Sequence, residues 1–333
     1  AYYASTQVVA FIADRWGMPK VRHMLELWGE GKRTPDVVQA ALGVSVDDVD
    51  RDFRASLTAR LARYRDQFAP PTRPGNVQAA RTLVAAAPKD AAHVSALALA
   101  LMSEGHDEEA AGTIDRALAL DPKNGLALWL RVQLAKTGND RAGTVKALGA
   151  LLAAGHDGYA VQMALSDAVE SPAAELAALT AAHNFDPSQA APVRRLAELA
   201  NRAHEEDAEL SALRQLVLLD ENDGNAYRRL MTLLLSRRDF EEARRVGESA
   251  VYVDMENAET HRLYAEALIG TGARKEALYE LGSAVRSNGS PAELQAAHLR
   301  FAELLTASGD RAGAAVQRKA AAALQDRTRT GPI

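Results

Sequence analysis

Residues 88–122 read PKDAAHVSALALALMSEGHDEEAAGTIDRALALDP. Two apolar-periodic segments lie between the prolines at its ends, separated by Gly105, and Asp121-Pro122 closes the second segment. Apolar residues that recur every three to four positions indicate amphipathic helices, and glycine and proline mark where such helices end. The stretch therefore predicts a helix–turn–helix unit whose period, the spacing of Pro88 and Pro122, is about 34 residues.

The same period continues toward the C-terminus. The position held by Pro122 recurs at the same interval from Pro187 onward, at Pro187, Glu221, Met255 and Gly289. The interval from Pro122 to Pro187 fits two repeats from which three residues are missing. We expect this deletion in the turns near Gly138 and Gly155, or near Ser171-Pro172.

Small residues recur where the two helices of such a unit must approach each other closely. Alanine holds the eighth, twentieth and twenty-seventh positions of well-formed repeats, as Ala98, Ala110, Ala117, Ala265, Ala277 and Ala284. This pattern resembles the tetratricopeptide repeat (TPR) family over residues 75–325, although the small positions drift in residues 124–187. The resemblance implies a superhelical solenoid of about seven repeats, a fold that presents a concave surface to a partner.

Composition agrees with an all-α fold and narrows the function. The 333 residues are rich in alanine, only 5% are aromatic, and there is no cysteine, so a thiol nucleophile or thiolate metal site is impossible. The net charge of −5 argues against a nucleic-acid surface, which would be basic. No apolar run approaches the roughly 18 residues needed to span a bilayer. No cofactor is expected.

The first seventy residues do not follow the repeat and are expected to form four helices. The first ends at Gly17, the second begins at Met18-Pro19, Thr34 caps the third, and Ser45 caps a fourth over residues 46–68. The residues expected on their apolar faces are Val8, Phe11, Ile12, Trp16, Val21, Met24, Leu25, Trp28, Val49, Phe53, Leu57, Leu61 and Tyr64. Three prolines and a glycine in residues 70–75 place a domain boundary there, giving a helical subdomain over 1–70 and a solenoid over 71–333.

This N-terminal segment resembles the C-terminal helical end of a peptidase MA-like (gluzincin) domain. The resemblance is carried, in order, by Tyr2-Tyr3, Gly31-Lys32, Ala41-Leu42-Gly43 and Asp52-Phe53. It implies a longer, bacterial parent protein and favours a periplasmic or secreted location, with a cytoplasmic one left open. The chain would then be the non-catalytic C-terminal portion of a zinc metallopeptidase whose His-Glu-x-x-His motif lies upstream.

The zinc motif itself does not occur in this chain. Two histidines four residues apart on a helix can reach one metal ion, but none of the eight histidines has such a partner. His204-Glu205 begins like the motif, yet Ala208 stands where the second histidine belongs. We therefore assign no catalytic residue and no metal ligand.

The remaining candidate is the groove of the solenoid. In the TPR family the first helix of each repeat lines the concave face through its second, fifth, ninth and twelfth positions. Arginine occupies the fifth position of three consecutive repeats. The predicted peptide-binding residues are Arg194, Glu198, Asn201, Asn225, Arg228, Thr232, Arg262 and Glu266.

Two interpretations of this row are open. Arginine binds carboxylates in a bidentate manner, which favours an acidic peptide ligand. Alternatively, the row is a solvated face that neutralises itself, because Glu198 follows Arg194 by four residues and Glu266 follows Arg262 by four. Arg228 has Thr232 at that distance and is expected to be the least neutralised of the three.

Overall fold

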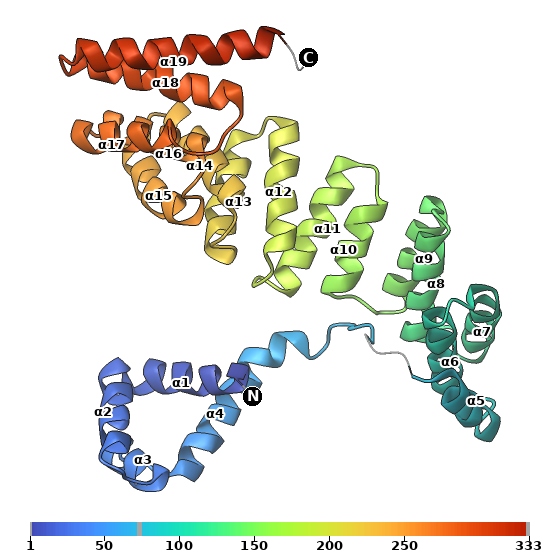
Figure 1. Cartoon of the computed structure of the whole chain (residues 1–333). Helices are drawn as coiled ribbons and strands as arrows, with labels where there is room; N and C mark the ends of the chain where they lie inside the picture. Colours follow the sequence, from blue (N-terminus) through green and yellow to red (C-terminus); the bar gives the residue numbers. More distant parts are fainter. Residues whose placement is uncertain (1, 72–74, 331–333) are drawn as a thin grey trace. The chain divides into compact units, whose positions relative to one another are not determined.

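The computed structural model describes residues 2–71 and 75–330, and in these ranges it contains nineteen α-helices and no β-strand. The all-α prediction is confirmed. The chain forms two compact units, which meet in the sequence between Gln67 and Phe68 (Figure 1).

The N-terminal unit contains four α-helices and a short 3-10 helix. These are α1 (Tyr2–Trp16), α2 (Met18–Gly29), α3 (Thr34–Leu42), α4 (Val46–Leu61) and η1 (Ala62–Tyr64). Ser45 caps α4 in a capping box with Asp48, as the sequence predicts. Each α-helix contributes to one core, through Ile12, Met24, Val37 and Val49 among others.

Three details of this unit differ from the prediction. Helix α4 ends at Leu61, well short of residue 68, and continues only as η1. Thr34 does not cap α3, because Arg33 holds the cap position and Thr34 is the first residue of the helix. The Thr34 hydroxyl instead accepts a 3.4 Å hydrogen bond from the Trp28 indole N–H. Three of the residues expected on apolar faces are exposed, Leu25 at 62%, Leu61 at 51% and Trp28 at 38%, and the buried stripe of α2 passes through Met24 and Leu27 instead.

The solenoid begins with the single helix α5 (Val77–Ala86), and the part described continues as seven helical hairpins. The hairpins are α6 (Ala91–Ser103) with α7 (Asp107–Leu120), α8 (Gly125–Thr137) with α9 (Arg141–Ala153), α10 (Tyr159–Ala168) with α11 (Pro172–Phe185), α12 (Ala190–Ala203) with α13 (Glu206–Leu219), α14 (Gly224–Ser236) with α15 (Phe240–Val253), α16 (Ala258–Gly270) with α17 (Arg274–Ala284), and α18 (Pro291–Ala307) with α19 (Arg311–Thr330). Figure 1 shows them stacked in chain order, from teal to red. The architecture is a TPR solenoid.

The alanines that define the repeat are buried as predicted. Those at the eighth, twentieth and twenty-seventh positions have no exposed surface in the repeats that begin at α6 and α16, namely Ala98, Ala110, Ala117, Ala265, Ala277 and Ala284. The larger residues between them, such as Leu101, Ile114 and Leu281, are buried too. Packing therefore accounts for the sequence pattern, as expected for core residues.

The three missing residues lie in one hairpin, α10–α11. In the hairpins α8–α9 and α12–α13 the first helix and the second begin at the same separation in the chain. In the hairpin between them, α10–α11, the separation between the first residues of the two helices is three residues shorter. The α10–α11 turn keeps three residues, as the α8–α9 turn does, whereas α10 has only ten residues against thirteen in α8. The deletion therefore shortens α10 and lies just before Ser171-Pro172, near one of the two predicted places.

A left-handed residue recurs in the hairpin turns, two residues before the second helix begins. It has positive φ at Gly105, Asn139, His204, Arg238, Gly272 and Gly309. The α10–α11 turn, whose three residues are all described, has no such left-handed residue. Left-handed backbone costs a residue with a Cβ about 1–2 kcal/mol, whereas glycine adopts it freely.

One buried position of the repeat is held by a histidine. The His261 ring has Nδ1 at 2.6 Å from a Glu280 carboxylate oxygen and Nε2 at 2.8 Å from the Met255 carbonyl oxygen. Both neighbours accept hydrogen bonds, so the doubly protonated ring satisfies both. Burial lowers the pKa of His261, but the hydrogen bonds to Glu280 and Met255 outweigh it, and the net pKa lies above the ordinary 6.5.

This pKa predicts a pH-dependent stability. A raised folded-state pKa stabilises the fold fully below pH 6.5, and this contribution is lost as the pH rises through the folded value. The thermal midpoint of the wild-type chain should therefore fall over that window. The variant His261→Gln, which does not titrate, should lack this component, and an unchanged pH slope in the variant would contradict the assignment.

The left-handed turns predict a second stability effect. Arg238→Gly should stabilise the chain by up to about 1 kcal/mol, because glycine removes the left-handed strain but gains entropy in the unfolded state. The matched change Gly272→Ala, at the same turn of the next repeat, should destabilise by a similar amount. Urea unfolding followed by circular dichroism measures both. Shifts of the same sign would show that this backbone conformation is not the cause.

Candidate functional site

The eight predicted groove residues lie on the first helices of three consecutive hairpins. Helix α12 carries Arg194, Glu198 and Asn201, helix α14 carries Asn225, Arg228 and Thr232, and helix α16 carries Arg262 and Glu266. The structure places seven of them around two recesses, one beside α12 and α14 and the other beside α14 and α16. Arg228 lines neither recess.

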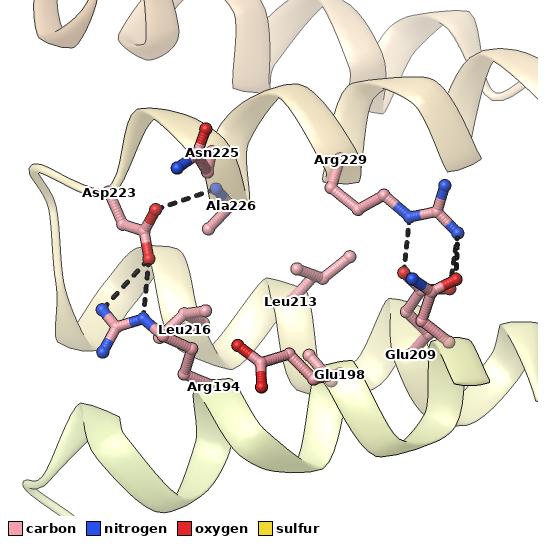
Figure 2. A pocket seen from close by; sticks show the side chains of 11 residues that line it. Arg194, Glu198, Glu209, Leu213, Leu216, Asp223, Asn225, Ala226 and Arg229 are labelled. Carbon is pink, nitrogen blue, oxygen red and sulfur yellow. Dashed lines mark hydrogen bonds and ion pairs between the residues drawn. The ribbon is translucent and has the colours of Figure 1, made fainter. Parts of the chain in front are cut away.

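The first recess has a volume of about 270 Å³ and lies between α12, α13 and α14. Its apolar floor comes from Ala197, Leu213, Leu216 and Ala226. Its polar lining comes from Arg194, Glu198, Asn201, Glu209, Asp223, Asn225 and Arg229. Figure 2 shows an arginine–carboxylate pair at each end and the Glu198 carboxylate between them.

Arg194 forms the ion pair at one end. Its Nη2 lies 2.7 Å from Asp220, and its Nε donates to Asp223 at 3.0 Å. Asp223 also caps α14 by accepting a 3.0 Å hydrogen bond from the Ala226 backbone N–H. Burial lowers the pKa of Arg194, but the bonds to Asp223 and Asp220 outweigh it and raise the pKa. The guanidinium is therefore charged and held in place.

Arg229 forms the pair at the other end. It donates to Glu209 through Nε at 2.5 Å and Nη2 at 2.9 Å, and to the Asn201 side-chain oxygen at 2.9 Å. The Glu209 side chain is only 3% exposed. The hydrogen bond to Glu209 raises the pKa of Arg229 against the opposing effect of burial.

The second recess, of about 370 Å³, overlaps in part with the position that the first recess would take one repeat later. It is lined by Thr232, Leu235, Ser236, Phe240, Arg262, Leu263 and Glu266. Three of these, Thr232, Leu235 and Leu263, stand one repeat after Glu198, Asn201 and Arg229 of the first recess. At these three shared positions the second recess carries less polar residues than the first. Arg262 is held by Glu259 at 2.6 and 2.7 Å, while Glu266 binds Arg300 at 2.7 and 2.9 Å.

Two expectations about charge are wrong. Arg228 is not the least neutralised arginine, because it is paired with Asp254 and also contacts Asn225 and Thr260. Arg194 does not pair with Glu198 but with the two aspartates of the following turn, Asp220 and Asp223. As a result Glu198, which is exposed, has no ion pair within the described ranges.

The sequence analysis missed a pair that recurs with the repeat. Arg195 binds Glu175 at 3.1 Å as Arg229 binds Glu209, and both members of the second pair stand one repeat after those of the first. In the next repeat the corresponding residues are Leu263 and Ala243, which are both buried. The recurrence of both arginine and glutamate at the repeat interval was the signal that could have revealed this pair.

The described part of the chain offers neither a metal site nor a helix that could span a membrane. It holds no group of three or more histidine, aspartate and glutamate side chains placed to bind a metal ion. None of its described helices combines the length and apolar character that crossing a bilayer requires.

No known family profile matches the chain, and no curated protein is significantly similar in sequence. Solved structures match at low identity. The C-terminal part of a TPR repeat-containing protein from Cytophaga hutchinsonii is 12% identical with a TM-score of 0.50, over 68% of this chain and 93% of that one. MamA (41–end) from Desulfovibrio magneticus RS-1 is 16% identical with a TM-score of 0.42, over 50% and 95%. YrrB, described as a TPR protein with an unusual peptide-binding site, is 17% identical with a TM-score of 0.28, over 63% and 92%.

At these identities the comparisons concern the fold alone. The Cytophaga structure and the hairpin pairing agree on a TPR solenoid. The function is therefore inferred from the arrangement of the two recesses.

The recurring arginine–glutamate pair yields a prediction about stability. Arg229→Ala leaves the buried Glu209 carboxylate without its guanidinium and should cost roughly 1–3 kcal/mol of unfolding free energy. The double variant Arg229→Leu/Glu209→Ala copies the residues of the next repeat and should recover part of that loss. Urea denaturation of the three proteins measures this. A double variant less stable than Arg229→Ala would contradict it.

Proposed function

We propose that this chain is a protein–protein interaction scaffold that binds a peptide segment along α12, α14 and α16. The observation that carries the proposal is the pair of recesses one repeat apart, which share three lining positions. A repeated recess on successive first helices suits a ligand that is itself extended and offers one side chain to each. Solenoids commonly use such surfaces for recognition.

The first recess is rigid before any ligand arrives. Its arginines are fixed by carboxylates from neighbouring helices and turns, so little side-chain entropy remains to be lost on binding. An apolar floor with polar groups fixed around it is typical of a binding site. The Asn201 side-chain oxygen is used by Arg229, and its Nδ2 is left to donate to a ligand carbonyl, since it has no partner in the described residues.

That the ligand is acidic stays a prediction, and the ion pairs of the arginine row weaken its support. All three arginines of the fifth positions already have carboxylate partners. An acidic ligand would have to share a guanidinium with these groups. We therefore expect a carboxylate of the ligand to contribute less than the apolar side chain that enters a recess.

Filling the first recess tests the proposal. Twelve-residue peptides would be selected from a random phage-displayed library on the wild-type chain and measured by isothermal titration calorimetry. Glu198→Trp places a large side chain in the recess without removing a described ion pair, and should weaken binding by about tenfold or more.

The matched control is Glu241→Trp on α15, which introduces the same residue at an exposed glutamate that lines neither recess. It should leave affinity unchanged. A selection that yields no binding peptide, or an equal effect of the two tryptophans, would contradict a peptide site on this face.

As the alternative, we propose that the chain is the non-catalytic C-terminal portion of a zinc metallopeptidase. Its support is the order of helices in the N-terminal unit: an aromatic-rich α1, the turn at Gly31-Lys32, α3 ending at Gly43, and α4 with Asp52-Phe53. The test is the sequence upstream of Ala1 and the zinc content of the longer protein. A His-Glu-x-x-His motif and one equivalent of zinc after dialysis would support this alternative. The absence of both would contradict it and leave the scaffold as the proposed function.

A further inference from the structure

We infer that the second repeat holds a separate subsite for an aromatic peptide side chain, and that Phe68 occupies it as a ligand from the same chain. Phe68 is the first residue of the solenoid unit and belongs to no helix. Its backbone N–H donates a 2.7 Å hydrogen bond to the Asp157 carbonyl oxygen. Its ring centroid lies 5.2 Å from that of His156 and 6.2 Å from that of Trp129.

The subsite is built to admit a ring. Gly125 begins α8, and a Cβ on this residue would lie 2.8 Å from the Phe68 ring and 2.9 Å from the His156 ring. Any side chain at this position would therefore expel one of the two rings. The His156 Nε2 is 2.6 Å from the Lys123 carbonyl oxygen, which fixes the imidazole as one wall.

The subsite lies at a repeat position that also lines the two recesses farther along the solenoid. Trp129 is the fifth residue of its repeat, as Arg194 and Arg262 are of theirs. Those two arginines line the recesses beside α14, so Phe68 docks at the equivalent level of an earlier repeat. A phenylalanine in a non-helical segment has thus taken the place that the proposed function gives to a peptide ligand farther along the solenoid.

The contacts define the class of ligand. One backbone N–H and one aromatic ring are recognised, and the residues that follow are Ala69, Pro70 and Pro71. Proline has no N–H to leave unpaired and favours an extended backbone. The subsite should therefore bind extended peptides through one aromatic side chain and the backbone N–H of the same residue. Phe68 competes with such peptides at the high effective concentration of a tethered segment.

A peptide supplied in solution tests this competition. The probe is a fluorescein-labelled peptide with the sequence of residues 65–71, RDQFAPP, measured by fluorescence anisotropy against the full chain. It should bind the Phe68→Ala variant at least about tenfold more tightly than the wild type, because the subsite is then empty. The same peptide with alanine in place of phenylalanine is the control and should not bind.

A second change shows where the probe binds. Adding Gly125→Leu to Phe68→Ala should abolish binding, with circular dichroism verifying that the solenoid stays folded. Glu198→Trp should leave the affinity unchanged, which separates this subsite from the α12–α16 face. Absence of binding to Phe68→Ala, or equal binding to that variant and the wild type, would overturn the inference.

Hydrogen exchange provides a readout that needs no peptide. The Phe68 amide of the wild-type chain should exchange more slowly than in an unstructured segment, because it donates to Asp157. Trp129→Ala should speed its exchange. A wild-type Phe68 amide that exchanges at the unstructured rate would also overturn the inference.

Discussion

The close approach of helix backbones at alanine is the constraint on which the solenoid depends. Ala98, Ala110 and Ala117 have no exposed surface. A larger side chain there would force the helices apart at a cost of about 1–3 kcal/mol. Each hairpin packs on its neighbours in the sequence, so the spacing inside one hairpin fixes where the next first helix lies. Two recesses that share lining positions one repeat apart follow from this regular stacking.

Charge pairs between different helices complete the inner face. Arg229 reaches back to Glu209 on α13, Arg194 reaches forward to Asp220 and Asp223, and Arg300 on α18 binds Glu266 on α16. Apart from Arg229, whose partner Glu209 is buried, these arginines and their partners are partly exposed, so their pairs contribute little stability individually. These pairs hold the side chains at the edges of the recesses in one geometry, and their carboxylates neutralise the positive charge of the arginines.

The sequence predicted the features that depend on local pattern. The alanine spacing, the loss of three residues near Ser171-Pro172 and the Ser45 cap of α4 all depend on residues close together in the chain. The register within α2 was missed, since Leu25 and Leu27 are both leucines and only packing distinguishes them.

Partners farther away in sequence were not predictable in the same way. Arg228 pairs with Asp254, which lies in the turn before the next repeat. The repeat period does not predict this pair, because it does not give the distance between a side chain on a helix and the residues of a neighbouring turn. The docking of Phe68 on Asp157 joins a segment outside the repeats to a turn between two of them. The eight predicted groove residues were grouped by repeat position alone, which located the first helices but not the charge balance of their side chains.

Photo-crosslinking gives the most direct test of the claim that the first helices bind a peptide. A peptide selected on the wild-type chain, with benzoylphenylalanine replacing its apolar side chain, would be irradiated in complex and the attached residues identified by mass spectrometry. Our account predicts attachment to α12, α14 and α16 at residues that line the two recesses. Attachment mainly to the apolar groove between α11, α12 and α13, which runs past Leu176, Leu199 and Ala212, would contradict it.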